Sequence, residues 1–366
     1  MKKILVYGLS STIGGTESYF MTLYRAIGLS GPVFDFLFPY DTGEIPYERE
    51  IRDAGGRIFR EYYQWCERKL PGAVSVRQFF DMHPGEWDGV YINIQSVDTA
   101  YRLLAEARRR GMKYRVMHAH STGYFHDRTW KNRLYELYFH MTKRKNVTDF
   151  LACSQAAGEF AFRGTSFTVI PDAVEFDRFQ ADPVRRKQMR RAYHVHENTV
   201  VLGSCARLVR LKNMDFALEI FRAYHKKRPD SCFLAAGDGP ERERLESLIR
   251  EYGLEDCVIL AGAVDNVPDY LQMMDIFLLP SRFEGFGIAL LEAQAAGLEC
   301  FTSAGVVPGE VNVTGHVHFI DLKEPEEIWA EKILETPPVR YDETKLLKNS
   351  DYTVEASVKK LTSLFG

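Results

Sequence analysis

The chain has 366 residues, of which 45% are hydrophobic, 13% aromatic and 27% charged. This is the composition of a globular protein, and it excludes a chain that is disordered, collagenous or coiled-coil as a whole. The length predicts two domains, each large enough to bury its own core. A formal net charge of −3 argues against a general nucleic-acid-binding protein, so no nucleic acid is expected as a partner.

The cysteines and the first residues bear on the cellular compartment. The six cysteines are scattered, with no pair at zinc-finger spacing, which indicates buried thiols in a reducing cytosol. The apolar run after Lys3 lasts about four residues and predicts a strand, because a signal peptide needs a longer run. No 18 apolar residues run together, so no transmembrane helix is expected. The expected location is the cytoplasm.

Short apolar runs alternate with longer helical patterns, which is typical of parallel sheets with crossover helices. Strands are expected in the first half at Lys3–Gly8, Val33–Phe38, Arg57–Phe59, Gly89–Ile92, Tyr114–His118 and Phe150–Cys153. Helices are expected there at Thr16–Gly28, Ser96–Arg110, Arg128–Lys145 and Ser154–Phe162.

The second half repeats this alternation. Its strands are expected at Val200–Ala206, Cys232–Ala236, Val258–Ala261, Ile276–Leu279 and Glu299–Thr302. Its helices are expected at Met214–Lys226, Glu241–Glu251 and Ile288–Ala296, and Asp351 to Phe365 has one apolar helix face.

These elements predict an α/β protein with two Rossmann-like, doubly wound parallel-sheet domains. Pro171 stops a strand and acidic, turn-forming residues follow it, so a hinge is placed at 169–180. The domains then cover 1–168 and 181–350, and a C-terminal helix over 351–366 is expected to dock back on the N-terminal domain.

In open parallel sheets ligands bind at the carboxyl ends of the strands, so the loops that leave the first-half strands are candidate sites. In the segment Gly14 to Glu17, Gly15 allows a ligand to approach the backbone closely and Thr16 can cap the helix that follows. The segment is equally compatible with a simple turn. His118 and His120 flank the end of another strand and are as compatible with packing as with a site. No third ligand stands nearby at a suitable spacing, so no metal is expected.

Two loops of the second half carry charge. Arg207 and Lys212 lie between a strand and a helix that Asn213 is expected to cap, and cations beside a helix N-terminus favour phosphate. The segment Gly237 to Pro240 is by itself interpreted as a tight turn.

The most specific pattern is the pair Glu284 and Glu292, with Gly285, Phe286 and Gly287 between them. A helix is expected to begin near Gly287 with its amides directed at the loop. Glu292 then lies within an apolar helix row, where a carboxylate needs hydroxyl or N–H partners. This suits a ligand with both sugar hydroxyls and phosphates.

Together these motifs resemble the retaining glycosyltransferases of the GT-B fold, in the large glycosyltransferase family numbered four. The motifs follow the family's order along the chain. They are Gly14 to Glu17, His118 to His120, Ile170 to Val174, Arg207 with Lys212, Gly237 to Pro240 and the E-x7-E pair. The segments 308–311 and 317–320 are similar to members that build capsular or exopolysaccharide repeat units. The resemblance implies two domains that face a cleft, with the acceptor on the first and the donor on the second.

The resemblance also implies residue roles. Arg207 and Lys212 would bind the donor diphosphate, Glu284 the sugar hydroxyls and Glu292 the ribose. Gly15, Gly285, Phe286 and Gly287 are assigned to the donor as well. His120 would lie beside the reacting sugar, and His118 and Glu17 are assigned to the acceptor. Asp172-Ala173 and Glu299-Cys300 depart from the family's usual Asn-Gly and Pro-Val.

The expected reaction moves a sugar from a nucleotide diphosphate sugar, by analogy a UDP-sugar, to a glycan acceptor that is lipid-linked. No D-x-D sequence occurs, and fixed positive groups can stabilise the leaving diphosphate, so metal independence and no cofactor are expected. The alternatives are a sugar-nucleotide 2-epimerase of the same fold and a non-catalytic nucleotide-sugar-binding protein.

One segment is strongly basic despite the near-neutral total. Residues 101–150 contain twelve Lys or Arg against four Asp or Glu, a net charge of +8, which leaves −11 for the rest. With aromatic residues among these charges, the segment is either a surface for an anionic membrane or a solvated helix face over buried aromatics. The first interpretation predicts peripheral binding to the inner face of the plasma membrane.

Overall fold

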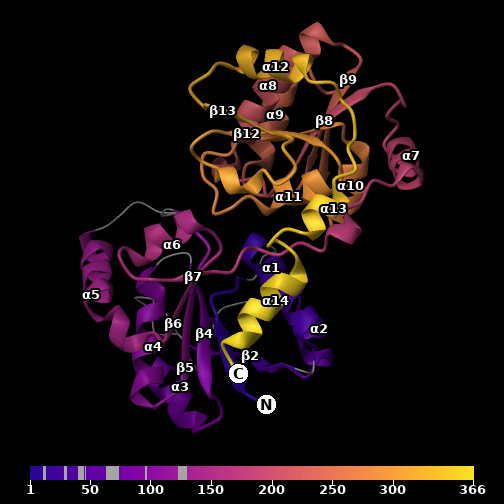
Figure 1. Ribbon diagram of the computed structural model, residues 1–366. Coiled ribbons are helices and arrows are strands. Elements are labelled where there is room, and N and C mark those ends of the chain that lie inside the picture. Colours follow the sequence, from indigo (N-terminus) through magenta and orange to yellow (C-terminus); the bar gives the residue numbers. More distant parts are fainter. Residues whose placement is uncertain are drawn as a thin grey trace. The chain divides into compact units, whose positions relative to one another are not determined.

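The computed structural model describes residues 1–10, 14–28, 31–39, 45, 47–62, 74–94, 97–122 and 130–366. These residues divide into two compact units, Met1–Ala173 with Val354–Gly366, and Val174–Thr353. The division falls within the segment 169–180, and the C-terminal residues belong to the first unit. Each unit is an α/β layer structure built on one parallel sheet (Figure 1).

The sheet of the first unit has seven strands in the order β3-β2-β1-β4-β5-β6-β7. The strands are β1 (Lys3–Tyr7), β2 (Val33–Pro39), β3 (Ile58–Tyr62), β4 (Gly89–Ile94), β5 (Tyr114–Ala119), β6 (Asp149–Ala152) and β7 (Thr168–Val169). All six residues of β4 are buried, because helices cover both faces of a parallel sheet and leave no polar side.

The helices of the first unit follow the strands in alternation. They are α1 (Gly15–Ile27), α2 (Glu48–Asp53), α3 (Val76–Met82), α4 (Val97–Arg109), α5 (Trp130–Asn146), α6 (Gln155–Phe162) and α14 (Val354–Ser363). The expected helices beginning at Ser96 and Arg128 therefore appear as α4 and α5, while residues 95–96 and 123–129 lie outside the described part of the chain.

The C-terminal helix α14 packs against α1 in the same unit (Figure 1). Val354 and Leu361 are buried, and the ring of Phe365 lies 5.3 Å from that of Tyr114. The Ser357 hydroxyl donates a hydrogen bond of 3.0 Å to the carbonyl of Pro171. The apolar spacing of this helix thus buries one face on the N-terminal sheet layer.

The sheet of the second unit has six strands in the order β10-β9-β8-β11-β12-β13. The strands are β8 (Val200–Cys205), β9 (Ser231–Ala236), β10 (Val258–Gly262), β11 (Ile276–Leu279), β12 (Glu299–Ser303) and β13 (Val317–Ile320). Its helices are α7 (Pro183–Ala192), α8 (Met214–Lys227), α9 (Arg242–Tyr252), α10 (Val267–Met273), α11 (Ile288–Ala295), α12 (Glu326–Glu335) and α13 (Thr344–Lys348). Three short 3-10 helices complete it, η2 (Phe176–Arg178), η3 (Arg210–Lys212) and η4 (Gly309–Val311).

The core of the second unit is apolar and fully enclosed. Phe221 of α8, Phe233 of β9 and Trp329 of α12 are at most 1% exposed and belong to one contiguous cluster. Trp329 also contacts the ring of Phe216 edge-on at 5.7 Å. Such burial supplies the main favourable free energy of folding.

The predicted fold class, two Rossmann-like parallel-sheet α/β domains, is confirmed by these two sheets. None of the helices in the described residues is long and apolar enough to cross a membrane.

Candidate active site

The sequence of the second unit places two loops together at the centre of its sheet. Strands β8 and β11 are neighbours, and the strand order reverses between them, so their exit loops meet at the position where open α/β sheets bind ligands. The backbone N–H of Arg282 donates to the carbonyl of Leu211 at 2.8 Å, which joins the loops directly.

Asn213 cross-links the same two loops and does not cap helix α8 through its side chain. It stands at the N-cap in a left-handed conformation with φ 57°, and its side chain makes no capping hydrogen bond. Instead its amide nitrogen donates to the carbonyl of Pro280 at 3.0 Å, and its amide oxygen accepts from Arg282 at 2.8 Å. The predicted cap is therefore wrong, because loop-to-loop hydrogen bonds use both polar atoms of the amide.

Lys212 and Glu284 form an ion pair across these loops. The Lys212 Nζ lies 2.6 Å from Glu284 Oε1, and the Ser281 hydroxyl donates to the same oxygen at 2.6 Å. The Glu284 side chain is 7% exposed and that of Lys212 27%, so the lysine keeps contact with solvent. The two donors fix the orientation of the Glu284 carboxylate.

The β9 loop, which leaves strand β9, lies next to the β8 loop, which contains Arg207 and Lys212, because β9 and β8 are neighbours in the sheet. Arg207 is exposed in the same β8–α8 loop as Lys212. In the next loop, a Cβ at Gly237 would lie 1.9 Å from the carbonyl oxygen of Ala206, and one at Gly239 2.4 Å from that of Leu208. The glycines are therefore required for the β9 loop to approach the β8 loop.

The segment between the two glutamates leads into helix α11. Gly287 is its N-cap with φ 98°, a conformation that favours glycine. Phe286 is 2% exposed, and its ring lies 5.1 Å from that of Tyr352. This packing anchors the loop, so Gly285 and the first amides of α11 are the groups of this segment suited to an anion.

Glu292 lies one turn inside α11 and is half-buried. Burial raises the pKa of its carboxyl to about 7, and Arg178 opposes that rise. Among the described residues its carboxylate has no hydrogen bond or ion pair. Such a carboxylate gains free energy when hydroxyl or N–H donors of a ligand reach it.

In the first unit, Gly15 and Glu17 lie in the first turn of helix α1, which follows β1 in the chain. Helix α1 begins at Gly15 after an extended Gly14, so Thr16 lies inside the helix, and the expected Thr16 cap is wrong. Glu17 is 4% exposed, and its Oε1 accepts from the backbone N–H of Ser10 at 2.7 Å. The structure thus uses the Glu17 carboxylate to bind the backbone at Ser10, just after β1.

The two histidines differ in accessibility. His118 is fully buried, its Nδ1 lies 2.6 Å from the Tyr91 hydroxyl, and burial together with His120 lowers its pKa well below the usual value. His120 is 9% exposed, with its Nε2 2.9 Å from Asn93 Oδ1 and its Nδ1 3.5 Å from Asp172 Oδ1. Both histidine side chains are therefore buried, and that of His120 keeps 3% exposure.

Within the second unit the structure brings Lys212 and Glu284 together and adds Ser281 and Asn213 beside them. In the first unit it adds Asn93 and Asp172 beside His120. Asn213, Asn93 and Asp172 were missed as site residues because their partners lie far along the chain. Ser281 lies only three residues before Glu284, but no sequence pattern singled it out.

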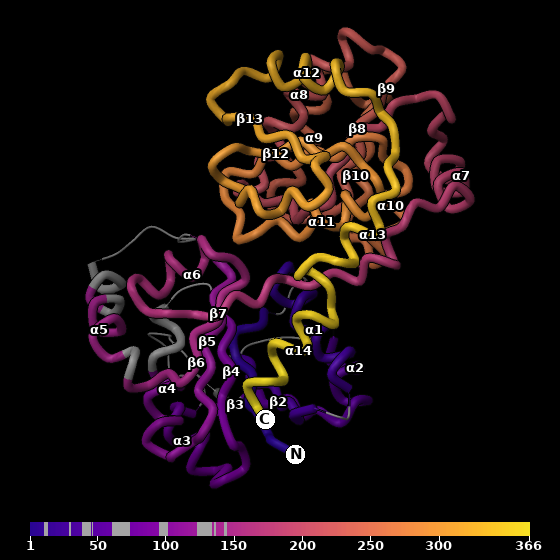
Figure 2. The backbone as a smooth tube through the Cα atoms, viewed as in Figure 1, coloured from indigo at the N-terminus to yellow at the C-terminus, as the bar shows by residue number. Residues whose placement is uncertain are grey.

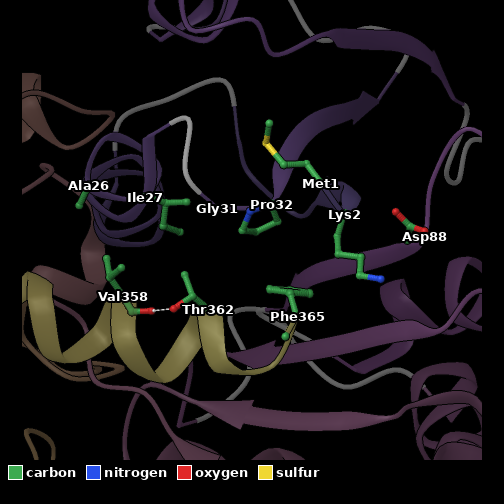
Figure 3. Close-up of a pocket in the computed structure, with 11 residues that line it drawn as sticks. Met1, Lys2, Ala26, Ile27, Gly31, Pro32, Asp88, Val358, Thr362 and Phe365 are labelled. Atoms are coloured by element: carbon green, nitrogen blue, oxygen red, sulfur yellow. Dashed lines mark hydrogen bonds between the residues drawn. The ribbon is translucent and has the colours of Figure 1, made fainter.

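A pocket in the first unit lies beside the start of β1 and is lined by residues of α1 and α14 (Figure 3). Met1 and Gly366 both line it, so the two ends of the chain meet near the start of β1 (Figure 2). Its lining contains none of the predicted site residues.

Comparisons with known proteins bear on the family and the fold. Residues 185–335 match the sequence model of the family described as Glycosyl transferases group 1. The GDP-mannose-dependent alpha-(1-6)-phosphatidylinositol monomannoside mannosyltransferase of Mycobacterium tuberculosis is 32% identical over 328 residues, 83% of this chain and 81% of that protein. EpsF of Bacillus subtilis (strain 168) is 28% identical over 364 residues, 96% of this chain and 93% of that protein.

Among solved structures, Anabaena Alr3699/HepE in complex with UDP-glucose matches with a TM-score of 0.72 at 16% identity. The match covers 100% of this chain and 95% of that one. At this identity the likeness establishes the GT-B fold alone.

Proposed function

The chain belongs to the glycosyl transferases group 1 family, and on this basis we propose that it moves a sugar from a nucleoside diphosphate sugar to a glycan, with retention at the anomeric carbon. The observation that carries this proposal is the Lys212–Glu284 pair at the switch point of the second sheet. The comparisons favour a transferase over a 2-epimerase.

The donor would occupy the loops that leave β8 and β11. Lys212 and the exposed Arg207 supply positive charge for the diphosphate, and the first amides of α11 add N–H donors. Glu284, held by Lys212 and Ser281, would accept hydrogen bonds from the sugar hydroxyls. The half-buried Glu292 would accept those of the ribose.

The chemistry follows from this placement. Breaking the bond between the anomeric carbon and the phosphate leaves an oxocarbenium-like sugar and a diphosphate with additional negative charge. Lys212 and Arg207 would stabilise that charge, and electrostatic stabilisation of this kind is usually the largest contribution to catalysis. His120 would lie beside the reacting sugar, Gly15 would contact the donor, and Glu17 and His118 are proposed for the acceptor. We propose that the reaction is metal-independent.

UDP is proposed as the nucleotide of the donor. HepE was crystallised with UDP-glucose, whereas the mycobacterial relative is named for GDP-mannose, so both bases must be compared. In thermal unfolding, the correct nucleotide sugar at 100 times its dissociation constant stabilises by about 2.7 kcal/mol. Stabilisation by UDP-glucose and not by GDP-mannose is expected; the reverse result would replace UDP by GDP.

The acceptor is proposed to be a lipid-linked glycan reached at a membrane. Helix α5 exposes an apolar stripe at helical spacing, made of Leu134, Leu137, Tyr138 and Met141, which are 48–74% exposed. This stripe lies in the segment with a net charge of +8, a combination suited to the interface of an anionic bilayer. The capsule or exopolysaccharide role is proposed on the resemblance of segments 308–311 and 317–320 to members that build such polymers.

The test is an assay of sugar transfer from the stabilising donor to a lipid extract. The anomeric proton of the product, followed by NMR, should have the configuration of the donor, and inversion would refute retention. Without added Zn²⁺, activity in excess chelator should be no lower than in its absence. A loss restored by magnesium or manganese would refute metal independence.

A further inference from the structure

Three buried side chains of the first unit meet at the carboxyl ends of neighbouring strands. His120 follows β5, Cys153 follows β6 and Asp172 lies beyond β7. A ring nitrogen of His120, the Cys153 Sγ and a carboxylate oxygen of Asp172 all lie within 4.8 Å of one another. Sequence spacing near His120 provides no such third ligand, and only the sheet order brings the three together.

The hydrogen bonding of His120 leaves one nitrogen facing the cluster. Its Nε2 lies 2.9 Å from Asn93 Oδ1, an acceptor, so Nε2 carries a proton and a neutral ring has its lone pair on Nδ1. Nδ1 lies 3.5 Å from Asp172 Oδ1, and both atoms are buried without a hydrogen-bond partner in the described structure. Two acceptor lone pairs facing each other in a buried site require a proton or a cation between them.

We propose that His120 Nδ1, Cys153 Sγ and Asp172 form a binding site for Zn²⁺. Nitrogen, thiolate and carboxylate are the zinc ligands found in proteins, and tetrahedral bonds of about 2.1 Å place ligand atoms about 3.4 Å apart. The observed 3.5 Å between Nδ1 and Oδ1 matches that spacing. The Asn93 contact has the geometry that fixes a metal-binding histidine in the required tautomer.

The charge balance of the site also suits Zn²⁺. Binding forms bonds from zinc to Sγ, Nδ1 and the carboxylate. It breaks the S–H bond of Cys153 and displaces the proton that lies between His120 Nδ1 and Asp172 in the metal-free site, and both protons leave to the buffer. The thiolate and the carboxylate then neutralise the two positive charges in a buried place. Mg²⁺ prefers oxygen ligands in octahedral geometry, so the site selects against it.

Zinc binding has a consequence that rests on the proposed function. His120 is proposed to lie beside the reacting sugar, so a zinc ion that holds its Nδ1 removes the ring from that task. Zn²⁺ should therefore inhibit sugar transfer, and a chelator should restore it. Zn²⁺ binding itself does not depend on the reaction, so the zinc site and the proposed sugar transfer can be refuted separately.

The experiment titrates chelator-treated full-length protein with Zn²⁺ by calorimetry and with Co²⁺ by absorption spectroscopy. The expected result is one Zn²⁺ per chain, unaffected by millimolar Mg²⁺, and a cobalt–thiolate charge-transfer band in the near ultraviolet. Cys153→Ser should abolish the band and weaken Zn²⁺ binding at least about tenfold, and Asp172→Asn should weaken it similarly.

The control is Cys232→Ser, which removes a buried thiol of the second unit and should leave the titration unchanged. Thermal unfolding of each variant without metal verifies that the fold is intact. Equal Zn²⁺ affinity in wild type and Cys153→Ser would overturn the site. The absence of Zn²⁺ binding would also overturn the site. NMR spectra would then show His120 and Asp172 as an imidazolium–carboxylate pair, with a proton between Nδ1 and the carboxylate oxygen.

Discussion

Lys212 Nζ lies 2.6 Å from Glu284 Oε1 and joins the two loops that leave the central strands of the second sheet. The lysine is the more exposed partner, so a ligand phosphate can share its charge while Glu284 keeps its position. Lys212 is therefore the partner that can act on a ligand, and Glu284 is the one held in place.

Lys212→Ala should lower kcat/KM for sugar transfer by about 10²–10³-fold, because it removes a fixed positive group from the leaving diphosphate. Lys187→Ala is the matched control, since Lys187 belongs to the same unit and is 76% exposed in a surface pair with Glu197. Steady-state kinetics with the stabilising donor measures both, and thermal unfolding verifies folding. Wild-type turnover by Lys212→Ala would contradict the assignment.

We expect donor binding to depend on pH because of the raised pKa of Glu292. Burial raises the pKa of its carboxyl to about 7, and hydroxyl donors of the ribose would stabilise the ionised form, so binding should release a proton. Affinity for a nucleotide sugar, whose phosphates do not titrate here, should rise about tenfold from pH 6 to pH 8. Calorimetry in buffers of different ionisation enthalpy measures the release. Glu292→Gln should remove the pH dependence, and its persistence there would assign the proton elsewhere.

Much of the fold could be predicted because parallel strands are continuous apolar runs, as in β4 and β8. Helix α7 was not predicted, because its sequence contains four arginines and few apolar residues. Arg186 and Arg190 dock it by contacting Asp275 at 2.5 and 2.6 Å. The sequence does not identify that partner, which lies far along the chain, although Asp182 and Pro183 mark the start of the helix.

The site was predictable to the extent that its residues are close in sequence. The glutamate pair and the β8 loop have recognisable spacing, whereas the contact between His120 and Asn93 depends on the pairing of β4 with β5. Asp172 was noted only as a departure in the linker. Its contact with His120 depends on the path of the chain after β7, which no local pattern specifies.

Gly237→Ala should destabilise the second unit. The residue has φ 150°, and an added Cβ would lie 1.9 Å from the carbonyl oxygen of Ala206, so the β9 loop must shift. A loss of about 3 kcal/mol corresponds to a fall in Tm of about 6–12 °C. Gly309→Ala is the control, because a Cβ there meets nothing within 4 Å. Equal Tm values for the two variants would show that the close approach of the loops is not required.

We expect the protein to bind anionic membranes through the apolar stripe of helix α5. Leu137 and Met141 are 58% and 74% exposed, so replacing both with serine should not disturb the core. In vesicle flotation the wild type should bind anionic but not neutral vesicles, and less so at high salt. The double variant should bind about tenfold more weakly, because two apolar side chains no longer enter the interface. Val184→Ser, which replaces an exposed apolar residue of α7, should bind like the wild type. Equal recovery with both vesicle types would contradict an electrostatic contribution, and unchanged binding by the double variant would exclude the stripe.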